Sequence, residues 1–126
     1  MKVELPLGDV VDKITILLIK VDKIGDAAKL ANIRTELQTL RQSWTEAGHT
    51  PLEELADWNG LREVNQNLWD VEDDLRDCER DGDFGPRFVE LARSVYHLND
   101  KRAALKRSIN VALGSRLVEE KSYAAY

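Results

Sequence analysis

Two predicted helices and the turn between them decide the fold; they occupy residues 61–109 and read LREVNQNLWDVEDDLRDCERDGDFGPRFVELARSVYHLNDKRAALKRSI. Apolar residues recur here at alternating spacings of three and four, the pattern of one helix face packing on another. The first half carries Leu61, Val64, Leu68, Val71, Leu75 and Cys78. The second half carries Phe88, Leu91, Val95, Leu98, Leu105 and Ile109. Because a turn containing Gly and Pro separates them, we expect a long antiparallel helical hairpin.

One position interrupts the apolar face of the second helix. Counting from Leu98, the next core position is Arg102, and Asn99 and Lys106 lie beside it. A buried guanidinium without partners is strongly destabilising, so Arg102 must meet a carboxylate, carbonyl groups, water or an anionic ligand. Folding the hairpin about its turn places Arg102 near Asn65. Two interpretations stay open: Arg102 fixes helix register or an oligomer interface, or it binds an anionic ligand between helices.

Two further helices are predicted ahead of the hairpin. Asp26 is a good N-cap, and Gly25 and Gly48 suit positions just after a helix ends. We therefore expect helices over about residues 8–23 and 26–47, packed as antiparallel neighbours because the loop between them is short.

The remaining segments connect or flank these four helices. Residues 1–7 are expected to form an extended arm, because Pro6 disfavours helix before it. A short helix over residues 51–58 should be separated from the hairpin by a break at residues 59–60, an Asn-Gly pair. The tail, residues 115–126, is too apolar to be wholly solvated, so we expect it to dock on the bundle or on a partner.

The helix over residues 8–23 is apolar on two sides, with Ile16 and Ile19 opposite its wide apolar face. One neighbour cannot cover both sides, so this helix is sandwiched in its own domain, covered by the arm or tail, or shared with a partner. The last possibility is our main reason to predict a homodimer. Trp69 and Tyr123 are further interface candidates, with packing of Trp69 on one of the first two helices as the alternative.

Composition bounds the functional class. A chain of 126 residues with 33% charged and 43% hydrophobic residues is typical of one globular domain, here residues 1–126. The net charge of −5 argues against nucleic-acid binding. We expect no membrane role, since there is neither a long apolar run nor a basic amphipathic face. The lone cysteine, Cys78, and the lack of a signal-peptide pattern favour a cytoplasmic protein with Cys78 in the core.

Few residues in the chain are arranged for chemistry. The carboxylates between Asp70 and Asp83 are numerous enough to suggest a divalent metal, but their spacing fits neither an EF-hand nor the paired acidic helices of nucleotide pyrophosphohydrolases. We expect a solvated acidic face moderated by Arg76 and Arg80, with no metal or other cofactor. The histidines lack catalytic or zinc-ligand spacing, so no catalytic residue is predicted. The tentative ligand-binding set is Asn65, Glu72, Asn99 and Arg102.

Several short motifs, taken together, are similar to one known family. They are PLGDVVDKITIL (6–17), AKLANIR (28–34) with Glu36 and Leu37, NLW (67–69) with EDD (72–74), DFG (83–85), Phe88, LARSVY (91–96), LND (98–100) and EEKSY (119–123). The chain resembles, over nearly its whole length, a family of small bacterial and phage proteins labelled only as a domain of unknown function. Some members occur near sugar-processing or glycosyl-transfer proteins. The resemblance implies no activity, but it draws attention to certain polar and aromatic residues: Asp12, Lys13, Asn32, Trp69, Glu72, Asn99, Asp100, Ser122 and Tyr123.

The sequence therefore predicts an all-α, antiparallel helical bundle built on the long hairpin, and self-association as a homodimer. The expected function is a non-catalytic interaction or assembly module, with a further protein partner possible. The alternative is an activity toward an anionic or sugar-nucleotide-like small molecule, or one that depends on a divalent metal, in a pocket between helices.

Overall fold

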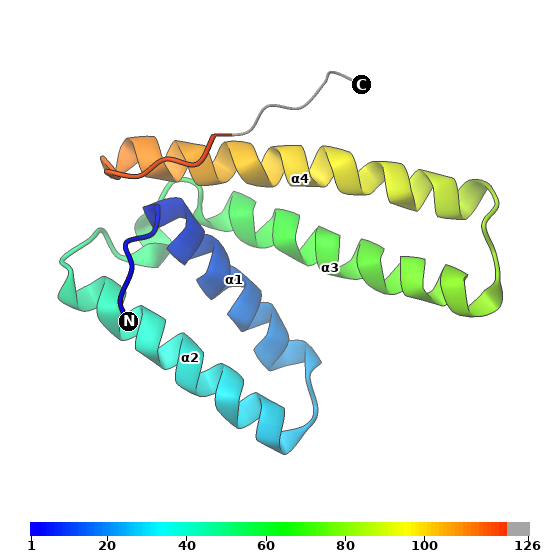
Figure 1. Cartoon of the computed structure of the whole chain (residues 1–126), viewed down its shortest axis with the longest axis horizontal. Helices are drawn as coiled ribbons and strands as arrows, with labels where there is room; N and C mark the ends of the chain where they lie inside the picture. The colour runs from blue at the N-terminus through cyan, green and yellow to red at the C-terminus, as the bar shows by residue number, and fades with distance from the viewer. Residues whose placement is uncertain (121–126) are drawn as a thin grey trace.

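The structure is a computed structural model that describes residues 1–120, and its four long helices confirm the all-α prediction. The helices are α1 (Leu7–Lys23), α2 (Ala27–Glu46), α3 (Trp58–Asp81) and α4 (Pro86–Ala112), with a short 3-10 helix, η1 (Leu52–Glu54), before α3. Helices α3 and α4 form the hairpin. Helix α1 packs against the half of the hairpin that contains the start of α3 and the end of α4, and α2 packs on the outside of α1 (Figure 1). The far half of the hairpin projects beyond α1 and α2 (Figure 1).

The ends of the helices follow the predicted signals closely. The Asp26 side chain accepts a hydrogen bond from the Lys29 N–H at 2.9 Å, as an N-cap does. Three glycines that follow helices, Gly48, Gly82 and Gly114, have φ between 65° and 76°, the left-handed conformation that glycine adopts without strain. Pro86 begins α4, where the missing N–H costs nothing.

The predicted break at residues 59–60 is wrong in position. The chain departs from helical geometry at Leu55, whose φ and ψ of −65° and 132° are extended, and α3 already begins at Trp58. This earlier break lets Leu52 and Trp58 both enter the core. Gly60 lies inside α3, where a Cβ would stand 3.3 Å from Leu105 Cδ2, so its small size serves helix packing.

The core lies where α1 meets the other elements, and every helix contributes to it. Its buried members are Val11, Ile14, Trp44, Leu52, Trp58, Leu61, Val64 and Ile109. The Trp44 indole N–H donates to the Thr50 carbonyl at 2.8 Å, which satisfies the polar atom of this buried ring. No helix within residues 1–120 combines the length and apolar character that crossing a bilayer requires.

Helix α1 is sandwiched between α2 and the hairpin, which corrects the argument drawn from its two apolar sides. Ile19 is only 6% exposed within the single chain, and Ile16 is half-buried. Ile19 is thus covered by its own chain and is not an available interface residue. The two-sided character of α1 no longer supports a homodimer.

The apolar face of the hairpin is covered unevenly. Beside α1, Leu61, Leu68 and Ile109 are buried, because a third helix closes the contact. In the projecting half only two helices are present, and most of the seam there is half-buried, although Cys78 is fully buried as predicted. The half-buried seam residues are Val71, Leu75, Phe88, Leu91 and Val95.

Candidate functional site

A buried polar cluster joins α1 to both helices of the hairpin. The Arg102 guanidinium donates from Nε to Asp12 Oδ1 at 2.9 Å and from Nη2 to Asp12 Oδ2 at 2.5 Å. The Asn65 amide donates to the same Asp12 Oδ1 at 2.9 Å and to Thr15 Oγ1 at 2.8 Å. The Thr15 hydroxyl donates in turn to the Asp12 carbonyl at 2.7 Å. Each carboxylate oxygen of Asp12 is therefore satisfied by protein donors.

The spacing of α1 explains why Asp12 reaches this position. Gly8, Asp12, Thr15 and Ile19 follow one another at intervals of four, three and four, and all four are buried. They form the stripe of α1 that faces the hairpin, so two polar side chains enter a helix contact that is otherwise apolar. The sequence predicted that Arg102 lies near Asn65, and the two side chains do meet, because both bind Asp12. The four-three-four spacing on α1 is the signal in the sequence that could have identified Asp12 as their partner.

The bidentate ion pair also raises the pKa of Arg102. The hydrogen bonds that its guanidinium donates to Asp12 are the largest influence, and they hold this pKa above its ordinary value despite partial burial. The Asp12 side chain is 7% exposed and that of Arg102 is 31% exposed. This is the geometry of a buried pair that sets the register of α1 on the hairpin, with one edge of the guanidinium near solvent.

A second polar cluster holds the first turn of α1 against the end of α4. The Gly8 N–H donates to Asn110 Oδ1 at 2.6 Å, and the Leu7 N–H donates to Ser115 Oγ at 3.2 Å. These bonds satisfy N–H groups that have no partner inside the helix. The approach is close because residue 8 has no side chain: a Cβ there would lie 2.3 Å from the Lys106 carbonyl oxygen.

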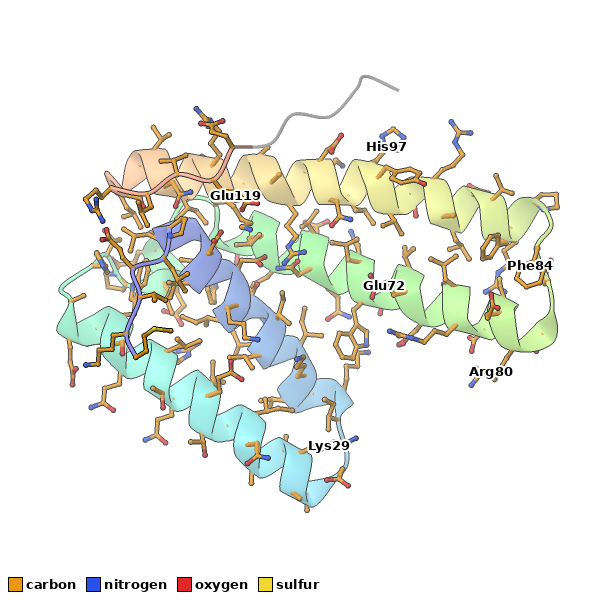
Figure 2. The ribbon with its side chains drawn as sticks, in the orientation of Figure 1. Lys29, Glu72, Arg80, Phe84, His97 and Glu119 are labelled. Atoms are coloured by element: carbon orange, nitrogen blue, oxygen red, sulfur yellow. The ribbon has the colours of Figure 1, made fainter. Side chains whose placement is uncertain are left out.

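Residues 115–120 return along α4 and add ion pairs to this cluster (Figures 1 and 2). Lys106 Nζ lies 3.0 Å from both Asp9 Oδ1 and Glu119 Oε2. Arg107 pairs with Glu120, and Arg116 pairs with Glu4 of the N-terminal arm. The described part of the tail therefore contacts its own chain; residues 121–126, including Tyr123, lie outside the described residues.

Lys106 should make the stability of the protein sensitive to alkaline pH. Burial lowers its pKa, but the contacts with the Asp9 and Glu119 carboxylates outweigh burial and raise the pKa above its ordinary value of 10.5. A pKa raised by folding gives stability that is complete below the unfolded value and is lost as the pH rises through the folded value. We expect Lys106→Met to lower the free energy of unfolding at neutral pH, and this difference from wild type to shrink above pH 10.5. Urea unfolding of both proteins across that range measures it; a difference that stays constant would contradict the ion-pair contribution.

The predicted ligand-binding set does not come together as a pocket. Asn65 and Arg102 meet through Asp12, but Glu72 lies two helical turns beyond Asn65, about 10 Å along α3. Glu72 is exposed, and its Oε2 atom lies 4.0 Å from Arg76 Nη2. Asn99 is half-buried on α4. No bond among the described residues joins Glu72 or Asn99 to Arg102.

The acidic cluster on α3 forms a paired, solvated face. Arg76 contacts Asp73 at 3.2 Å, Arg80 pairs with Asp77, and Arg87 of α4 lies 3.8 Å from Asp74. Within residues 1–120, no three His, Cys, Asp or Glu side chains are grouped so that they could hold a metal ion.

A surface that was not predicted from the sequence lies on the outer side of α4. Phe84 in the turn is 54% exposed, and Val89 and Tyr96 are 50% and 62% exposed. An open hollow of about 800 Å³ follows this side of the hairpin. We call this surface the outer stripe of α4; it comprises Phe84, Gly85, Pro86, Val89, Glu90, Arg93, Ser94 and His97, with Tyr96 beside it. In Figure 2, Phe84 lies at the tip of the hairpin and His97 on the side of α4 away from α3.

The outer stripe is a weaker sequence pattern than the buried seam, which contains most of the large apolar residues of this part of α4. Val89 and Tyr96 are seven residues apart, the same heptad interval as the seam, but on the opposite side of α4. Trp69, the aromatic residue that the sequence suggested instead, is half-buried on α3.

Comparison with known proteins assigns the chain to a family whose function is unknown. The family of unknown function DUF6165 matches the chain over residues 1–126. No curated protein and no solved structure matches it.

Proposed function

The chain belongs to this family of unknown function, and we propose that it is a non-catalytic assembly module that self-associates through the projecting half of its helical hairpin. The observation that carries the proposal is the outer stripe of α4, where Phe84, Val89 and Tyr96 are each at least half exposed beside an open hollow. Exposed aromatic and aliphatic side chains grouped on one rigid helix are the usual content of a protein interface.

The projecting half of the hairpin leaves this stripe uncovered. Two packed helices cover only one side of each other, and α1 and α2 do not reach this part of the hairpin, so the outer side of α4 keeps apolar surface that a second copy can bury. The alternative, a ligand pocket around Arg102, loses its main support because Asp12 already neutralises the guanidinium through two hydrogen bonds. The interface proposed here therefore replaces the one expected at Ile19.

Val89→Asp is the first test. We expect wild type to show an average mass that rises from one chain toward two as its concentration increases, and Val89→Asp to shift this rise to at least tenfold higher concentration, because a carboxylate must be desolvated in the contact. Sedimentation equilibrium or light scattering measures both. A charge near the N-terminal end of α4 is compatible with the helix dipole, so folding should be preserved.

The same helix offers a matched control. Val111 is 67% exposed but lies at the other end of α4, away from the outer stripe. Val111→Asp should leave association unchanged. A monomeric wild type at high micromolar concentration, or equal effects of the two substitutions, would contradict the proposal. Thermal stabilisation by divalent metals, nucleotides or nucleotide sugars would instead favour a ligand-dependent activity.

A further inference from the structure

The outer stripe of α4 has a symmetry that identifies how a second copy would bind. Its six helical residues are Pro86, Val89, Glu90, Arg93, Ser94 and His97. In an antiparallel pair of identical helices related by a two-fold axis, residues opposite each other have numbers with a constant sum. When the axis passes between residues 91 and 92, Pro86 lies opposite His97, Val89 opposite Ser94, and Glu90 opposite Arg93.

We propose that two copies of this chain pack antiparallel through the outer stripes of α4, with Glu90 of each copy paired to Arg93 of the other. This inference rests on the proposed function and specifies its geometry. The two-fold axis maps the stripe onto itself, so the same surface serves both copies and the contact closes as a dimer.

The charges of the stripe fit this register. Glu90 and Arg93 carry opposite charges, and within residues 1–120 neither takes part in an ion pair. The two-fold register forms the Glu90–Arg93 pair twice, once on each side of the axis, which fixes orientation and disfavours parallel packing, where like charges would meet.

The outer side of α3 does not offer the same fit. Between Asp70 and Asp81, seven carboxylates outnumber two guanidinium groups. A two-fold contact there would bring acidic surfaces together, which opposes association. Of the two outer sides of the hairpin, the charge distribution therefore favours that of α4 as the surface shared by two copies.

The size of the contact sets the expected affinity. The six helical residues cover 11 intervals of α4, or roughly 16 Å of helix. With Phe84 and Tyr96 extending the contact, this is a small interface, and small interfaces belong to weak or transient complexes. We expect a dissociation constant in the micromolar range.

Charge reversal at the two paired positions tests the register. Glu90→Arg places two guanidinium groups together across the axis in both halves of the dimer, and Arg93→Glu places two carboxylates together. Each single variant should dimerise at least about tenfold more weakly than wild type. An equimolar mixture of the two should regain an affinity close to that of wild type, because each pair across the interface again joins opposite charges. The double variant should recover in the same way.

Sedimentation equilibrium of each protein and native mass spectrometry of the mixture give the readout. Glu63→Arg, an exposed charge reversal on α3 away from the stripe, is the matched control and should dimerise like wild type. Circular dichroism establishes that each variant is folded.

The possible results separate this inference from the proposed function. If Val89→Asp weakens association but the mixture of charge variants is no better than either alone, the module stands and the Glu90–Arg93 register is overturned. If both single variants dimerise like wild type, the register is likewise overturned. If wild type is a monomer, both proposals fall.

Discussion

Replacing Arg102 with methionine is expected to lower the free energy of unfolding by about 3 kcal/mol, a large share of the stability of a domain of this size. The substitution keeps much of the apolar volume but leaves the Asp12 carboxylate, which is 7% exposed, with the Asn65 amide as its remaining side-chain donor. Breaking a buried pair costs more than the pair contributes, because an uncompensated charge stays behind. Urea unfolding followed by circular dichroism measures the loss.

The matched variant is Asp12→Asn, and the two sides of the pair should differ. Arg102 is 31% exposed, so without Asp12 its guanidinium can turn toward water, and we expect a loss of only about 1–2 kcal/mol. The double variant should lose less than the sum of the single losses, because removing both charges leaves none uncompensated. Additive losses, or a neutral Arg102→Met, would show that the pair does not hold α1 on the hairpin.

Gly8→Ala is expected to cost about 3 kcal/mol, although alanine is the better helix former by about 1 kcal/mol. The new Cβ would lie 2.3 Å from the Lys106 carbonyl oxygen, which belongs to the α4 backbone and cannot rotate away. Helix α1 would have to shift away from α4, and the 2.6 Å hydrogen bond from Gly8 to Asn110 would lengthen or break. The change in denaturation midpoint at unchanged slope reports this loss.

Gly25 supplies the control for this substitution. A Cβ at Gly25 meets no atom within 4 Å, and Gly25 has no positive φ. Gly25→Ala should therefore change stability by no more than about 0.5 kcal/mol, or raise it slightly through the entropy of the unfolded chain. Equal effects at the two glycines would contradict the close approach of α1 to α4.

Together these two predictions separate the structural core from the proposed interface. Asp12, Arg102 and Gly8 hold α1 in place, so their substitution should reduce stability and affect association only through folding. Val89, by contrast, is half exposed and should affect association with little effect on stability. This division is the main functional consequence of the ion pair: because Asp12 neutralises Arg102, the surface proposed for association is the outer stripe of α4 and not the contact between α1 and the hairpin.

Much of the fold was predictable from local rules. The heptad pattern from Leu61 to Ile109 identified the hairpin, because apolar side chains at that spacing can only be buried together. Asp26, Pro86 and the glycines after α2, α3 and α4 set helix ends through cap geometry and backbone conformation, which depend on a few neighbouring residues. The start of α3 at Trp58 was misplaced, because burial of Leu52 and Trp58 in a shared core decides it.

In the candidate site, too, part of the arrangement follows from local sequence and part from tertiary packing. The amino-acid sequence by itself determined that a charge at Arg102 needs a partner, because an isolated guanidinium in an apolar face is too costly. Only the tertiary structure decided that the partner is Asp12, 90 residues away on α1, since this depends on how α1 crosses the hairpin. The exposure of Val89 and Tyr96 was decided in the same way. Periodicity places residues on a helix face, but the neighbouring helices determine which faces are covered.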